Sequence, residues 1–130
     1  MGLFNLFGNS ESTRKGAENR SKWVSLISPE QLDLLADNSV SRPQIIYKHS
    51  TTCGISSMVF RSFEANHALL PEKADLYFLT IQQNRQLSNE ISQRFNVRHE
   101  SPQLLVIKNG VLVLHASHSA IPHVGLEKYL

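Results

Sequence analysis

At 130 residues the chain suits one domain with one modest hydrophobic core, and it is too short for a multidomain or repeat architecture. Apolar residues make up 41% and charged residues 18%, as in water-soluble globular proteins, and no apolar run is long enough to span a bilayer. The net charge of +2 arises in the first 22 residues, and the remainder carries nine basic and nine acidic residues. This balance argues against a nucleic-acid groove, which needs clustered Lys and Arg.

The amino-terminal residues 1–22 are polar after a short apolar start, and we expect a flexible tail before a single domain over residues 23–130. The tail lacks the small-residue cleavage site of a secretory signal. It begins like a myristoylation signal, but Leu6 stands where Ser or Thr is required. One cysteine in the whole chain excludes an internal disulfide framework and suits the reducing cytoplasm.

The domain opens with "KWVSLI", a short strand candidate. A helix follows, with Ser28 as its cap and Pro29 at its first position. Its buried face is predicted to be formed by three leucines, Leu32, Leu34 and Leu35.

The stretch "QIIYKH" is predicted as a buried strand that leads through the turn "STTC" into a helix. This helix is expected from about Gly54 to His67, so that Cys53 lies at its amino-terminal end. Its buried stripe is predicted to consist of Ile55, Met58, Val59 and Phe63.

The second half of the chain begins with a buried strand, "DLYFLTI", and a helix carrying Leu87, Ile91 and Phe95. "QLLVIKNGVLVLHAS" is expected to form a hairpin, because Asn109-Gly110 suits the positive φ angles of a two-residue turn. A last helix is predicted to begin at Pro122. The order β-α-β-α-β-α-β-β-α predicts an α/β, thioredoxin-like fold, with a mixed central sheet and helices on both faces.

The position of Cys53 favours a reactive thiol. The first turn of a helix offers unpaired N–H groups and the positive end of the macrodipole, both of which stabilise a thiolate. The hydroxyls of Thr52 and Ser56 are candidate donors to that thiolate, and Gly54 leaves room for a substrate sulfur. Lys48 is a nearby cation whose side chain can point away along a strand, and for His49 we favour a structural role over one in tuning the thiol pKa.

Ser56 stands where a resolving cysteine would complete a dithiol motif. A mixed disulfide on Cys53 must therefore persist until an outside thiol resolves it. A lone cysteine in an arbitrary protein is usually an inert buried residue. The place of Cys53 between Thr52 and Gly54 at a helix start favours transfer of a small thiol instead.

Two further stretches are predicted to meet at the same end of the sheet. Ser101-Pro102 precedes a buried strand, and a cis bond there would leave the Ser101 backbone free to pair with an extended substrate across from Cys53. The return strand of the hairpin brings Ser117, His118 and Ser119 beside Pro102, where they could hold the tail of a small thiol.

His115 and His118 are also candidate metal ligands, with Cys53 as the third ligand. Residues three apart on a strand face opposite sides of a sheet, so the two histidines would not converge without a bend. We expect no protein-bound metal.

From Trp23 to Leu130 the chain resembles the YtxJ-type monothiol bacilliredoxins, thioredoxin-fold proteins of the bacillithiol system. The motif of that family reads Lys-His-Ser-Thr followed by Thr-Cys-Pro-Ile-Ser, and this chain has "KHSTTCGIS". Its Ser-Pro before a strand, its Asn-Gly hairpin and its "ASH" at residues 116–118 are also similar to the family.

The resemblance implies a thiol-disulfide oxidoreductase in which Cys53 is the nucleophile and Pro102 the cis-proline facing it. It implies that bacillithiol, or a related low-molecular-weight thiol, is the co-substrate. The partners would be S-thiolated proteins, together with a small thiol or redox partner as the resolving agent, and neither nucleic acid nor membrane.

Gly54 departs from the family motif, which has Pro there. "CGIS" is close to the Cys-Gly-Phe-Ser of monothiol glutaredoxins, which keeps open an iron-sulfur cluster carrier using Cys53. A third hypothesis is a thioredoxin-like adaptor whose cysteine has no catalytic role and whose thiol pKa would be near 8.5.

Overall fold

The computed structural model describes residues 22–52 and 54–130. The predicted tail therefore lies outside the described residues except for Lys22, an exposed turn residue. In the described part of the chain, no helix combines the length and the apolar character needed to cross a membrane. The helices and strands, in chain order, are β1 (Trp23–Ser25), α2 (Pro29–Asn38), β2 (Gln44–His49), α3 (Gly54–Asn66), α4 (Leu70–Lys73), β3 (Asp75–Thr80), α5 (Arg85–Arg94), β4 (Gln103–Lys108) and β5 (Val111–Ser117).

The described strands form one five-stranded sheet in the order β1-β3-β2-β4-β5. β3 runs parallel to both β1 and β2, whereas β4 is antiparallel to β2 and to β5. This mixed sheet confirms the predicted thioredoxin-like arrangement. Because Lys48 pairs with Gln103, the end of β2 lies beside the beginning of β4, and the segments that precede and follow these strands share one end of the sheet.

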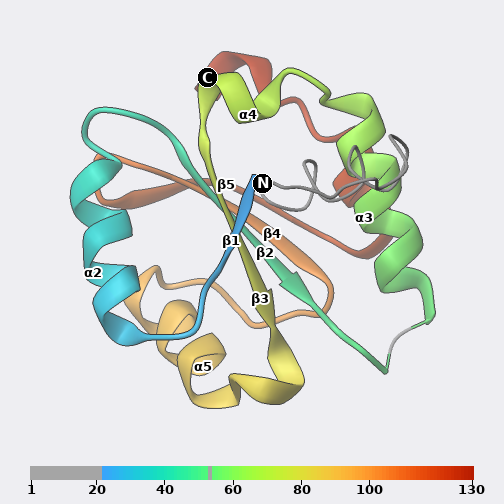
Figure 1. Ribbon diagram of the computed structural model, residues 1–130, viewed down its shortest axis with the longest axis horizontal. Coiled ribbons are helices and arrows are strands. Elements are labelled where there is room, and N and C mark those ends of the chain that lie inside the picture. Colours follow the sequence, from blue (N-terminus) through green and yellow to red (C-terminus); the bar gives the residue numbers. More distant parts are fainter. Residues whose placement is uncertain (1–21, 53) are drawn as a thin grey trace, which may run out of the picture.

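Helices cover both faces of the sheet, as predicted (Figure 1). α2 and α5 lie on one face, and α3 and α4 lie on the other. Side chains alternate between the two faces along β2. Ile46 packs among the residues on the α2 and α5 face, and Ile45 and Tyr47 pack on the α3 face.

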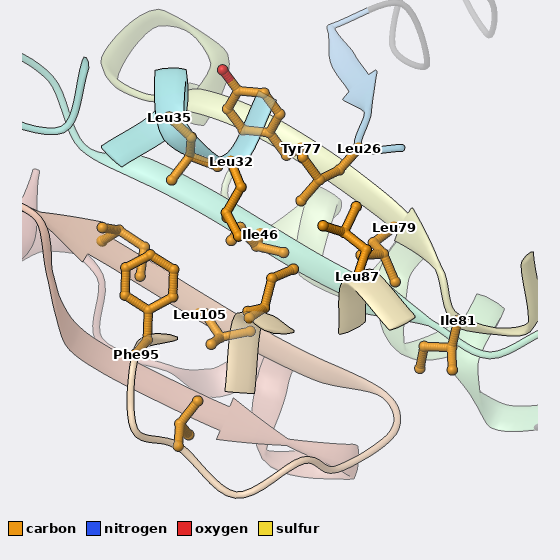
Figure 2. Close-up of a cluster of buried hydrophobic side chains, with 13 residues drawn as sticks. Leu26, Leu32, Leu35, Ile46, Tyr77, Leu79, Ile81, Leu87, Phe95 and Leu105 are labelled. Atoms are coloured by element: carbon orange, nitrogen blue, oxygen red, sulfur yellow. The ribbon is translucent and has the colours of Figure 1, made fainter. Parts of the chain in front are cut away.

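α2 begins as the sequence predicts. The Ser28 side chain accepts a hydrogen bond from the backbone N–H of Gln31, and the Gln31 side chain accepts one from the Ser28 N–H, forming a capping box. Leu32 and Leu35 are fully buried against Ile46 and its neighbours (Figure 2). Leu34 was wrongly predicted as buried: it is 55% exposed, because it faces away from the sheet.

The buried face of α3 also differs from the predicted stripe. Ser56, Val59 and Phe63 are buried, whereas Ile55 and Met58 are exposed. The face of α3 that packs on the sheet is centred about one residue away from the predicted apolar stripe. The small side chain of Ser56 fits at the junction with β2. A hydroxyl therefore occupies a place where an apolar residue was expected.

The hairpin between β4 and β5 matches its prediction. Asn109 and Gly110 have φ angles of 53° and 77°, as a two-residue turn with left-handed backbone requires. The backbone N–H groups of both residues bond to Ser39, one to its carbonyl and one to its hydroxyl, which ties the turn to the end of α2.

The predicted last helix is wrong. Residues 118–129 contain two short 3-10 helices, His118–His123 and Glu127–Tyr129, instead of an α-helix beginning at Pro122. Pro122 lies inside the first of these, and Val124 has an extended backbone that separates the two. Burial of Ile121 and Leu126 on the α3 face decides this conformation in place of helical periodicity. α4, a four-residue helix, was not predicted.

Adjacent leucines in α2 offer a matched test of this packing. We expect Leu35→Ala to lower the free energy of unfolding by about 2–5 kcal/mol, because it leaves a cavity among fully buried side chains. Leu34→Ala, at a position 55% exposed in the same helix, should change it by less than about 1 kcal/mol. Urea titration followed by circular dichroism measures both, and equal losses would contradict the assigned burial.

Candidate functional site

The predicted nucleophile, Cys53, lies outside the described residues, but both of its flanks are described. β2 ends at His49, a turn carries the chain through Ser50, and α3 begins at Gly54. Gly54 is exposed, and a Cβ atom added there would meet nothing within 4 Å. No tight packing therefore requires a glycine at this position, and the role of Gly54 in admitting a substrate sulfur stays a prediction.

Gln82, which the sequence analysis missed, ties the turn before residue 53 to the end of β3. Its side-chain Nε2 donates to Ser50 Oγ at 3.0 Å and to Thr52 Oγ1 at 3.1 Å. Its Oε1 accepts the backbone N–H of Thr51 at 3.0 Å. One amide thus contacts three successive residues. The signal was weak but present, because a polar residue just after a parallel strand lies at the same end of the sheet as the turn after its neighbour.

Ser56 occupies the centre of the junction between β2 and α3. Its Oγ accepts the backbone N–H of Ser50 at 3.2 Å and lies 2.9 Å from His49 Nδ1. Its carbonyl accepts the Tyr47 hydroxyl at 2.9 Å. A hydroxyl has one proton, so where His49 Nδ1 is the acceptor, the predicted hydrogen bond from Ser56 to a thiolate competes with the bond to His49.

His49 points toward α3, between aromatic rings. Its ring centroid lies 5.1 Å from that of Phe78 and 6.3 Å from that of Tyr47. Burial lowers the pKa of His49 below its ordinary value of 6.5, so the imidazole is neutral at pH 7. The residue therefore contributes a hydrogen-bonding nitrogen to this junction and no positive charge.

Lys48 points to the opposite face, as the alternation of a strand allows. Its fully buried side chain places Nζ 3.0 Å from the Ser88 carbonyl, 3.0 Å from Ser92 Oγ and 3.3 Å from His99 Nδ1. Burial lowers the pKa of Lys48 from 10.5 to about 8. Lys48 thus packs under α5 and does not supply a cation on the α3 side of the sheet.

The second wall of the site forms where β4 begins and β5 ends. The Ser101-Pro102 peptide bond is cis, and Pro102 is buried. Ser117 pairs with Gln103, and the backbone N–H of His118 donates to the Pro102 carbonyl at 3.1 Å. The structure therefore brings together Ser101, Pro102, Ser117 and His118, as the sequence predicted, at the end of the sheet where β2 terminates.

Glu100 adds a carboxylate to this wall and was not predicted from the sequence. It accepts a hydrogen bond from the Ser117 hydroxyl, which lowers the pKa of Glu100 below its ordinary value. The positive charges of His118, Arg98 and His115 lower it further. His118 has a φ of 55°, so the backbone bends directly after β5, where His118 and His115 both act on the Glu100 carboxylate. Among the described residues, no group of three or more His, Cys, Asp and Glu side chains could hold a metal ion.

Comparison with known proteins identifies a matching family and solved structures with a similar fold. A family model described as monothiol bacilliredoxin BrxC matches residues 24–126. A solved structure described as a candidate oxidoreductase with a thioredoxin fold is 32% identical, with a TM-score of 0.67, and the match covers 78% of this chain and 88% of that one.

Thioredoxins share the fold at lower identity. The protein from Fasciola hepatica is 19% identical, with a TM-score of 0.63, over 82% of this chain and 94% of its own. That from Malassezia sympodialis is 17% identical, with a TM-score of 0.61, over 82% and 86%.

The contacts of Gln82 predict a local effect of its removal. Gln82→Ala should speed hydrogen exchange of the Thr51 amide by about fivefold, because one net hydrogen bond contributes about 1 kcal/mol. Gln83→Ala, the exposed neighbour, should leave the Thr51 rate unchanged. Amide exchange measured by NMR decides this, and equal rates in all three proteins would show that Gln82 does not hold the turn.

Burial of Lys48 predicts a dependence of stability on pH. Between pH 8 and 10.5 the unfolded chain binds a proton that the folded chain lacks, so the free energy of unfolding should rise with pH there, by about 3 kcal/mol at most. Lys48→Met should be more stable than wild type at pH 7 and should lose this rise. Urea titrations across the pH range test it, with the exposed Lys73→Met as control. A rise that persists in Lys48→Met would refute the assignment.

Proposed function

The chain belongs to the monothiol bacilliredoxin family and is a thiol oxidoreductase, and from this we propose that it removes bacillithiol, or a similar low-molecular-weight thiol, from S-thiolated proteins. Cys53 is the nucleophile of this reaction. The observation that carries the proposal is the serine three residues after Cys53, on the first turn of α3. Because Ser56 has no thiol, the captured group stays on Cys53 until another thiol removes it.

The exchange takes place in two balanced steps. The Cys53 thiolate attacks the bacillithiol sulfur of a protein mixed disulfide, the Cys53–bacillithiol bond forms, and the protein thiolate leaves and takes up a proton. A second low-molecular-weight thiolate or a redox partner then attacks this new disulfide, takes the bacillithiol and regenerates the Cys53 thiolate. Neither step oxidises a second cysteine of this chain.

The first turn of α3 supplies the means of activation. The helix spans thirteen residues and has no acidic residue in its first turn, so its amino-terminal N–H groups and dipole favour an anion at the preceding position. Lys48 and His49 add no positive charge there, because Lys48 lies under α5 and His49 is neutral. Activation is therefore assigned to the backbone.

The wall formed by Ser101, Pro102, Ser117 and His118 is the proposed binding place of the small thiol. The hydrogen bond from His118 to Pro102 and the pairing of Ser117 with Gln103 hold these residues in one place beside the end of β2. Hydroxyl, imidazole and carboxylate groups there suit a polar, charged thiol better than an apolar one. A reducing compartment such as the cytoplasm suits the reaction, because it keeps a single thiol free.

A transfer assay tests the proposal. Wild type incubated with an S-bacillithiolated protein should release the protein thiol and gain the mass of one bacillithiol on the peptide that contains Cys53. Cys53→Ala should slow release at least 100-fold, to the uncatalysed rate. Mass spectrometry of both proteins over time measures the transfer.

Equal release by wild type and Cys53→Ala would end the proposal. A glutathionylated substrate run in parallel shows whether the small thiol is selected. Visible absorbance of the purified protein, lost in Cys53→Ser, would support the iron-sulfur cluster carrier instead.

A further inference from the structure

The two edges of the sheet differ in how far they are protected from another strand. β1, at one edge, has three residues, and the Ser25 carbonyl accepts a hydrogen bond from Gln31 Nε2 at 2.9 Å. A side chain of α2 therefore occupies part of that edge. β5, at the other edge, has seven residues, and none of them is Asp, Glu, Lys, Arg or Pro. Charged side chains and prolines are usual means of preventing an edge strand from pairing with another chain, and β5 lacks both.

The bonding between β5 and β4 shows which backbone groups of Ser117 face outward. Ser117 pairs with Gln103, and the next N–H along β5, that of His118, donates to the Pro102 carbonyl at 3.1 Å. In an antiparallel ladder, bonds of this kind flank a pair whose two members do not bond to each other. The N–H and C=O of Ser117 therefore point away from β4.

His115 repeats this arrangement one step along the edge. It pairs with Leu105, and bonded and non-bonded pairs alternate along a regular ladder, so its N–H and C=O also face outward. Within residues 22–52 and 54–130, these outward groups of His115 and Ser117 form no hydrogen bond. They present donors and acceptors at the two-residue spacing that a further strand requires.

This open segment has a definite beginning and end. A register shift between Val106 and Ile107 interrupts the regular alternation on the hairpin side of His115. On the other side, the φ of 55° at His118 turns the chain away after Ser117. The regular open edge is thus confined to residues 115–117.

We propose that this edge pairs with the same edge of a second copy of the chain, antiparallel and about a two-fold axis at Ala116. In this register His115 lies opposite the partner's Ser117, and Ser117 lies opposite the partner's His115. Each of the two pairs exchanges two hydrogen bonds, so four bonds join the edges. The two five-stranded sheets then form one continuous sheet.

The residues of β5 favour a second copy over an arbitrary extended segment. A two-fold axis places β5 against itself, and a charged strand would meet like charges there, but β5 carries no Asp, Glu, Lys or Arg. Ala116 meets its own copy at a non-bonded position, where the Cα atoms approach to about 4.5 Å and a methyl group fits. The two open segments also match in length, because the same shift and the same bend end both.

The pairing is expected to be weak and reversible. It uses three residues of each copy and is small beside interfaces of stable dimers, so we expect half of the chains to pair only at roughly 100 µM or above. The inference goes beyond the proposed function and does not depend on it, because it uses only the backbone of β5. Failure of the transfer assay would leave it intact.

Disulfide trapping in the full chain tests the register. Cys53→Ser removes the native thiol, and Ala116→Cys then places one thiol where each copy meets the other. With copper-phenanthroline as oxidant, this variant should form a covalent dimer at least about tenfold faster than Val111→Cys in the same background. Val111 is 58% exposed on the same strand, so random collision would favour it instead. Non-reducing gel electrophoresis over time gives both rates, and equal rates or a faster Val111→Cys would overturn the proposal.

Two further variants of the Ala116→Cys chain separate the backbone from the side chain at position 115. His115→Pro removes an outward N–H and no bond to β4, so it should slow the cross-link at least about tenfold. His115→Ala keeps that N–H and should stay within about threefold of the parent rate. An equal loss in both variants, or a loss in neither, would contradict the pairing.

Amide exchange of the unaltered chain keeps the test decisive if a variant fails to fold. Between about 20 and about 500 µM protein, exchange of the His115 and Ser117 amides should slow about twofold or more, whereas amides of α2 should not change. Unchanged exchange at both amides would refute the inference. Protection that appears only after an S-thiolated protein is added would refute it too, and would assign the edge to a strand of that protein.

Discussion

The candidate site depends on the junction at which β2 ends and α3 begins, and Ser56 holds that junction together. Its hydroxyl and carbonyl connect it to Tyr47, His49 and Ser50 of β2 and the following turn. These contacts fix where the amino-terminal turn of α3 lies relative to the sheet. The buried side of α3 is thereby joined to the end of β2.

The two neighbouring segments complete this arrangement from either side. Gln82, just after β3, holds the turn of residues 50–52, and the cis-proline segment before β4 carries the opposite wall. All three segments come from the same end of the sheet, because β2 and β3 are parallel and β4 begins where β2 ends. The order of strands thus explains why residues distant in the sequence meet at one place.

Sequence reasoning predicted the elements that depend on local signals. The turn at Asn109-Gly110, the capped start of α2 and the bounds of β2 follow from residues close to one another in the chain. The return of Ser117 and His118 to Pro102 followed from the register of a hairpin. Several such signals agreed with one topology, which is why the predicted fold class was correct.

The missed features depend on contacts between distant segments. Glu100 has no local pattern that marks it, and Gln82 has only the weak signal of its place after a strand, since their partners lie about seventeen and thirty residues away. The burial of Ser56 and the exposure of Ile55 and Met58 depend on how α3 is rotated against the sheet. The apolar periodicity of the sequence predicted a rotation that differs from the observed one by about one residue. The prediction of a last α-helix was wrong for a related reason, because packing of Ile121 and Leu126 outweighed the local preference for helix.

The central claim is that Cys53 carries a small thiol during its working cycle, and the chain taken from its own cells tests this directly. Intact-mass analysis under non-reducing conditions, after the cells meet a disulfide stress, should show one added bacillithiol or related thiol, located on the peptide that contains Cys53. A chain recovered with Cys53 wholly unmodified under conditions in which other cellular proteins are S-thiolated would contradict the account.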